Sequence, residues 1–99
     1  MNSKIETYIG FAIKKGSVVF GCDNIGNYRK KVYLLLKTKT LSNNSASVIQ
    51  SVADKRAIEL LEIDDYDLLA KRNCKALAIC DKSLADAIIT AYSFTANNL

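Results

Sequence analysis

The sequence predicts a layered α/β domain of about four strands with helices on both faces of the sheet. Segments whose apolar residues recur at helical spacing alternate with short apolar runs along the whole chain, which is typical of this class. The run Val32–Leu36 is continuously apolar. Such a run indicates a strand that is covered on both faces, so we expect it at the sheet centre.

Length and composition favour one small domain, residues 1–99, without a linker. The chain has 99 residues, of which 49% are hydrophobic, enough for a single core. Its 14 basic and 10 acidic residues give a net charge of +4, which favours anionic partners. Three cysteines without a C-x-x-C pair, and no signal-like start, predict a reduced, cytoplasmic protein.

The chain begins with a predicted helix from about Lys4 to Lys15. Ser3 and Glu6 match a capping box at its start, and apolar residues then recur at helical spacing. Gly16 follows as a C-terminal cap, because glycine takes the left-handed conformation without steric cost. The helix therefore ends just before the first strand.

A strand, an irregular turn and a second strand come next. Val18–Phe20 is short, β-branched and aromatic, which predicts a strand. In Cys22–Lys31, Gly26 and Asn27 interrupt any helix within about one turn, so we expect an irregular turn that ends in a basic triplet. Val32–Leu36 is the second strand.

The middle of the chain predicts a helix and a third strand. Asn43, Asn44 or Ser45 can cap a helix that ends near Arg56. Ala57–Ile63 is then the third strand.

The last third predicts a short helix, a fourth strand and a closing helix. Asp64 or Asp65 caps the short helix, and Ala76–Cys80 is the strand. A second capping box places Ser83 at the start of the closing helix. The tail Thr95–Leu99 is expected to fray.

Catalytic chemistry has few candidates in this sequence. Histidine is absent, which removes imidazole bases, triads and most zinc sites. Cys22 or Cys74 as a nucleophile would need a lowered pKa, and no histidine is available to deprotonate either thiol. We therefore expect no enzymatic activity, no cofactor and no metal.

Basic residues near the predicted loops are the remaining candidates. Tyr28 lies among them, where a nucleic-acid base could stack on it. These residues are Lys14, Lys15, Arg29, Lys30, Lys31, Lys37, Lys71, Arg72 and Lys75. On composition alone, a phosphate-binding surface and a solvated rim account for them equally well.

The run from Ile9 to Asp23, IGFAIKKGSVVFGCD, resembles the opening of the L-seven-Ae family of kink-turn-binding ribosomal proteins, and most of all its small bacterial YlxQ-type members. The segments VYLLLK, SNNS at Ser42 to Ser45, and ALAICD then fall in the family's order, so the resemblance extends over most of the chain. The matching residues in the first run are Gly10, Ala12, Lys14, Lys15, Gly16, Val18, Val19, Gly21 and Asp23.

This resemblance implies a three-layer α/β/α sandwich with a mixed sheet of about four strands. It also implies a non-catalytic, ribosomal or ribosome-associated protein of the translation machinery that binds structured, kink-turn-like RNA. The segment Gly21 to Lys31 and a second loop, Ala70 to Lys75, correspond to the family's RNA-contacting segments. The predicted RNA-binding residues are Lys14, Lys15, Gly21, Asp23, Asn24, Asn27, Arg29, Lys30, Lys31, Arg72 and Lys75.

The chain departs from the family pattern on this recognition surface. Asn24 stands where the family often has glutamate, and Asn27 stands at its lysine position. The first segment is shorter by about four residues, one turn of helix, and the second loop lacks the usual glycine. These departures support an alternative function, a protein-interaction module that keeps the sandwich and has lost specific RNA binding.

Overall fold

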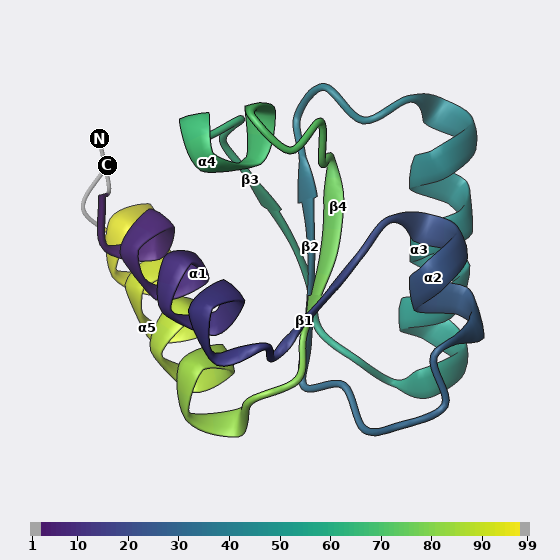
Figure 1. Ribbon diagram of the computed structural model, residues 1–99, viewed down its shortest axis with the longest axis horizontal. Coiled ribbons are helices and arrows are strands. Elements are labelled where there is room, and N and C mark those ends of the chain that lie inside the picture. The colour runs from purple at the N-terminus through teal and green to yellow at the C-terminus, as the bar shows by residue number, and fades with distance from the viewer. Residues whose placement is uncertain (1–2, 98–99) are drawn as a thin grey trace.

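A four-stranded mixed sheet lies between two layers of helices in the computed structural model, which describes residues 3–97 (Figure 1). The elements in chain order are α1 (Ser3–Lys15), β1 (Val18–Phe20), α2 (Cys22–Asn27), β2 (Leu34–Thr38), α3 (Asn43–Arg56), β3 (Leu60–Ile63), α4 (Asp67–Ala70), β4 (Ala76–Ile79) and α5 (Lys82–Asn97).

The strand order across the sheet is β1-β4-β2-β3. β4 is antiparallel to both of its neighbours, and β2 is parallel to β3. α1 and α5 pack together on one face, and α2 and α3 cover the other (Figure 1). This arrangement confirms the predicted α/β class, the mixed sheet and the helices on both faces.

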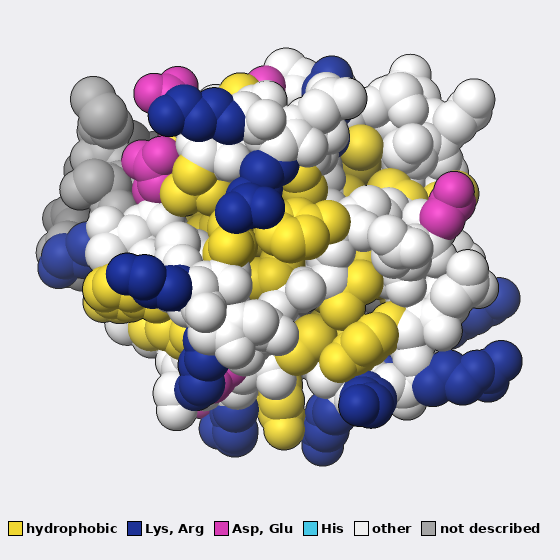
Figure 2. Space-filling view, viewed as in Figure 1, with side chains coloured by type: hydrophobic (Ala, Val, Ile, Leu, Met, Phe, Trp, Pro, Cys, Tyr) yellow, Lys and Arg dark blue, Asp and Glu magenta, His cyan; other side chains and the backbone are white. Residues whose placement is uncertain are grey.

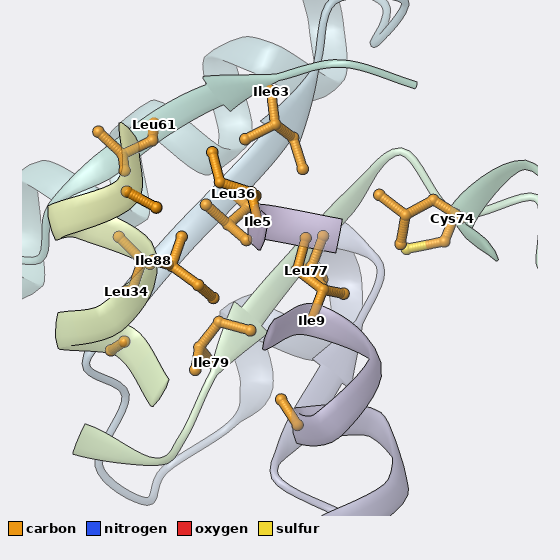
Figure 3. Close-up of a cluster of buried hydrophobic side chains, with 14 residues drawn as sticks. Ile5, Ile9, Leu34, Leu36, Leu61, Ile63, Cys74, Leu77, Ile79 and Ile88 are labelled. Atoms are coloured by element: carbon orange, nitrogen blue, oxygen red, sulfur yellow. The ribbon is translucent and has the colours of Figure 1, made fainter. Parts of the chain in front are cut away.

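The core is divided between the two faces of β2. Leu34 and Leu36 are fully buried in the cluster under α1 and α5, which Figure 3 shows with Ile9 of α1 and Ile88 of α5. Leu35, also fully buried, points to the opposite cluster under α2 and α3. The prediction of a central strand covered on both faces is therefore confirmed, although the strand begins at Leu34, two residues later than expected.

The predicted irregular turn at Cys22–Lys31 was partly wrong, because Cys22–Asn27 forms the six-residue helix α2. Ile25 is fully buried against the α2/α3 side of the sheet. Burial of this side chain stabilises a helical turn that local propensity disfavours at Gly26 and Asn27. Tertiary packing thus overrides the local signal.

Two helix starts differ from the predicted caps. α3 is capped by Ser42, whose hydroxyl accepts a hydrogen bond from the Ser45 amide at 3.3 Å. α5 begins at Lys82, and Asp81 accepts a bond from the Leu84 amide at 2.9 Å. In both cases the capping side chain comes from an earlier residue than predicted, because its oxygen is the one that reaches the backbone amide three residues on.

The predicted cap of the short helix was also wrong. α4 has Tyr66 at its N-cap position, without a side-chain hydrogen bond. Asp64 pairs instead with Lys39 at 3.1 Å, and Asp65 accepts a bond from the Thr40 hydroxyl at 3.1 Å. These carboxylates connect the end of β3 to the turn after β2.

Several element ends differ as well. β3 begins only at Leu60, because Ala57 adopts a left-handed conformation (φ 53°) at the end of α3. α5 continues to Asn97, so the expected fraying is wrong for residues 95–97, while residues 98–99 lie outside the described part. The predicted capping role of Ser3 also lies outside it, since that side chain is not described. Within residues 3–97, no helix is long and apolar enough to cross a membrane.

The packing of Ile25 leads to a test of how α2 is held. Ile25→Ala should lower the free energy of unfolding by roughly 2–5 kcal/mol, because it removes buried methyl groups and leaves a cavity. Urea unfolding followed by circular dichroism measures the change. Val48→Ala is the control, since Val48 is 45% exposed and should cost little. An Ile25→Ala protein as stable as the control would contradict this account of α2.

Candidate nucleic-acid interface

The loops of this fold meet at two opposite edges of the sheet. β1, β2 and β3 end at one edge, where β4 begins; we call this the upper edge, as it is drawn in Figure 1. The lower edge is formed by the starts of β1, β2 and β3 and by the end of β4. Functional residues on loops must therefore belong to one edge or the other.

A hollow of about 300 Å³ opens at the upper edge. It is lined by Phe20, Gly21, Arg72, Asn73, Cys74 and Lys75. Gly21 begins one of the two segments singled out in the sequence, Gly21–Lys31, and residues 72–75 end the other, Ala70–Lys75. Phe20 directly precedes the first segment. The fold brings the start of the first segment and the end of the second together.

Backbone hydrogen bonds hold the walls of this hollow in place. Gly21 has a positive φ of 89°, and its amide donates to the Ala76 carbonyl at 2.9 Å. Asn73 also has a positive φ (51°), and the next amide, that of Cys74, returns to the Leu69 carbonyl at 2.9 Å. Positive φ is ordinary for glycine and tolerated by asparagine, so both turns suit their residues.

The cationic side chains of the hollow differ in how they are held. The Arg72 guanidinium lies over the Phe20 ring, 5.3 Å from its centroid. A cation–π contact of this kind contributes about 0.5–1 kcal/mol at an exposed site and limits the motion of the arginine. Lys75 is exposed and forms no ion pair within the described residues. The hollow thus offers one cation oriented by an aromatic ring and one cation without an ion pair among the described residues.

Asp23 and Asn24 lie beside the hollow, in the first turn of α2. The Asn24 side-chain amide donates to the Phe20 carbonyl at 2.9 Å, so this group helps to end the edge strand β1. Asp23 is exposed, and its charge adds to burial in raising the pKa of the Cys22 thiol. Both residues therefore shape the start of α2.

The other predicted RNA-binding residues lie at the lower edge. α1 ends there with Lys14 and Lys15, and α2 ends there with Asn27. The segment between α2 and β2, with Arg29, Lys30 and Lys31, follows at the same edge. The strand segment from Ser17 to Gly21 separates the two edges by about 13 Å, at 3.3 Å per residue. The structure thus divides the predicted set into two groups.

Lys15 has a structural partner at the lower edge. It forms an ion pair with Asp81, the residue that caps α5. The Lys15 ammonium, together with the Leu84 amide, lowers the pKa of the Asp81 carboxyl below its ordinary value of 3.8. This pair ties the end of α1 to the start of α5.

Arg56 was not recognised in the sequence, where it marked only the end of a helix. Its guanidinium donates to the carbonyls of Tyr28 and Lys30, at 3.0 and 2.8 Å. The expected stacking role of Tyr28 has less support, because that ring packs against the α2/α3 core. A hydrogen bond with the Cys80 thiol raises the pKa of the Tyr28 hydroxyl. Phe20 was also missed; its position directly before Gly21 is the signal for it.

The comparison with solved structures shows a shared fold. A protein of unknown function from Bacillus halodurans C superposes with a TM-score of 0.75 at 10% sequence identity, over 90% of this chain and 96% of that one. No protein-family model matches the sequence, and no curated protein is similar to it in sequence. The shared architecture therefore rests on structure alone.

The Lys15–Asp81 pair predicts a pH-dependent stability. Because the pKa of Asp81 is lower in the folded protein than in the unfolded chain, the ionised carboxylate stabilises the fold above pH 3.8. This stabilisation is lost as the pH falls through the folded-state pKa of Asp81. Asp81→Asn should therefore lower the melting temperature at pH 7, and the gap to the unmodified protein should narrow below pH 3.8. Lys15→Gln should show part of this effect and its neighbour Lys14→Gln none. A gap that is constant with pH would contradict this role of the carboxylate.

The buried thiol of Cys74 is expected to react slowly with alkylating reagents. Burial raises the pKa of Cys74 above its ordinary 9.0, and the side chain is only 7% exposed. Iodoacetamide at pH 7 should modify Cys74 only after unfolding, as measured by mass spectrometry of the digested protein. Fast labelling of the folded protein would instead favour an activated thiol.

No three metal-ligating side chains gather within the described residues.

Proposed function

We propose that this protein is a non-catalytic RNA-binding protein that holds structured RNA in the hollow at its upper edge. One observation carries this proposal. Gly21, which begins the first segment matched by family resemblance, and residues 72–75, which end the second segment about fifty residues later, line the same hollow. Residues that are distant in sequence and converge on one hollow are expected for a binding surface more than for a solvated rim.

The lining has the chemistry that RNA requires. Arg72 and Lys75 supply positive charge for phosphate oxygens, and arginine can engage two oxygens at once. Gly21 has no side chain, which lets a sugar-phosphate backbone approach the main chain closely. The Phe20 ring, which packs against the α1/α5 core, supports the Arg72 guanidinium that lies over it.

The resemblance to the L-seven-Ae family supports the choice of partner. Its expected sandwich agrees with the observed layers, and its members commonly bind kinked RNA stems. On this basis we propose a ribosomal or ribosome-associated role in the translation machinery, in the cytoplasm. Residues Gly21, Asp23 and Asn24 would lie next to the RNA, with Arg72 and Lys75 on its phosphates.

Binding to a kink-turn RNA and to a straight duplex of equal length tests this proposal. The unmodified protein should prefer the kinked RNA. Arg72→Gln with Lys75→Gln should weaken binding to the kinked RNA by roughly tenfold or more and bring the affinity ratio of the two RNAs toward one, because both cations of the hollow are lost. Fluorescence anisotropy across a salt titration measures both affinities.

The matched control is Lys39→Gln with Lys82→Gln. It removes the same charge from two exposed ion pairs, with Asp64 and Asp86, outside the hollow. This control should keep the affinity ratio within about twofold, since exposed pairs contribute little. An equal loss in both double variants would show that net charge alone acts. No binding to either RNA at moderate salt would favour the protein-interaction alternative.

A further inference from the structure

Charge is distributed unevenly between the two edges. At the upper edge, the carboxylates Glu62, Asp64, Asp65 and Asp67 surround the end of β3 and α4. Figure 2 shows most of the visible acidic side chains in the upper half and a row of lysine and arginine side chains along the lower border. The net charge of +4 is therefore concentrated at the lower edge.

Acidic residues compensate only part of the lower edge. Asp81 pairs with Lys15, and Asp86 pairs with Lys82 at 3.0 Å. Apart from Arg56, whose guanidinium binds two carbonyls, the cations of this edge that form no ion pair within the described residues are Lys14, Arg29, Lys30, Lys31 and Lys55. We call these five residues the lower-edge cations.

Helix dipoles explain some of these residues but not the central ones. Lys14 and Lys55 lie in the last turns of α1 and α3, where they complement the negative ends of the helices. Arg29, Lys30 and Lys31 lie outside any helix and are all exposed. A solvated helix end therefore does not account for this triplet.

The triplet is held in a fixed conformation despite its own repulsion. Arg56 donates to the Tyr28 and Lys30 carbonyls, which fastens the segment to the end of α3 and adds a fourth cation beside it. On the other side, the Lys31 ammonium lies 5.6 Å from the centroid of the Tyr33 ring. Arg29, Lys30 and Lys31 carry like charges on consecutive residues, and like charges repel one another. A bound polyanion would remove this repulsion.

We infer that the lower-edge cations form a second nucleic-acid surface, which binds the phosphate backbone of an RNA segment other than the one in the upper hollow. The choice of RNA among polyanions rests on the proposed function. The surface consists of exposed cations, three of them consecutive, and such side chains contact phosphate oxygens. A hollow of about 310 Å³, lined by Gly26, Asn27, Tyr28, Arg29 and Arg56, lies beside them. The protein thereby holds two RNA segments, one at each edge of its sheet.

Binding to a straight RNA duplex alone tests this surface. Lys30→Gln with Lys31→Gln should weaken duplex binding by roughly tenfold at 0.1 M salt and lower the slope of log affinity against log salt by about 1–2, because each lost phosphate contact removes about 0.9. The Lys30 carbonyl that Arg56 binds is retained in this variant. The matched control, Lys39→Gln with Lys82→Gln, should keep the slope of the unmodified protein.

The outcomes separate this inference from the proposed function. An unchanged slope in the Lys30→Gln, Lys31→Gln protein, or an equal change in the control, would overturn the second surface. The preference for kinked RNA is tested by the Arg72→Gln, Lys75→Gln protein. Its outcome does not alter the conclusion from duplex binding by the Lys30→Gln, Lys31→Gln protein. Binding to phosphatidylserine vesicles that depends on Lys30 and Lys31, without duplex binding, would overturn RNA as the partner of this edge.

Discussion

Burial of the central strands on both faces determines how the rest of the molecule is laid out. Leu34 and Leu36 of β2 enter the core under α1 and α5, while Leu35 enters the core under α2 and α3. β4, its neighbour, is buried along its whole length. A sheet that is apolar on both faces must be covered by two helical layers, so polar loops remain only at its two edges.

The two edges take different properties from this layout. At the upper edge, a chain reversal at Gly21 and a tight turn at Asn73 leave a hollow with cations on its wall. At the lower edge, α1, α2 and α3 all end, and the negative ends of their dipoles favour lysine and arginine. The cations that stabilise these helix ends therefore add positive charge at the edge where the exposed triplet Arg29, Lys30 and Lys31 lies.

Local signals failed where a distant contact was stronger than local preference. Gly26 and Asn27 disfavour helix, yet α2 forms because Ile25 is buried against α3 and the sheet. Arg56 looked like a helix-ending residue, yet its guanidinium bonds to two carbonyls more than twenty-five residues away. Neither the burial of Ile25 nor the hydrogen bonds of Arg56 can be recognised from the neighbouring residues, so spacing and propensity did not predict them.

The sequence by itself determined the α/β class, the order of helices and strands apart from α2, and the central position of the continuous apolar strand. These features depend on the spacing of apolar residues along the chain. It also indicated which residues carry positive charge. Only the tertiary structure decided which of these residues share a surface. Arg72 and Lys75 join Gly21 at the upper edge, while Arg29, Lys30 and Lys31 lie at the other edge of the sheet. Neighbourhood in space follows from strand order and direction, which local sequence patterns do not encode.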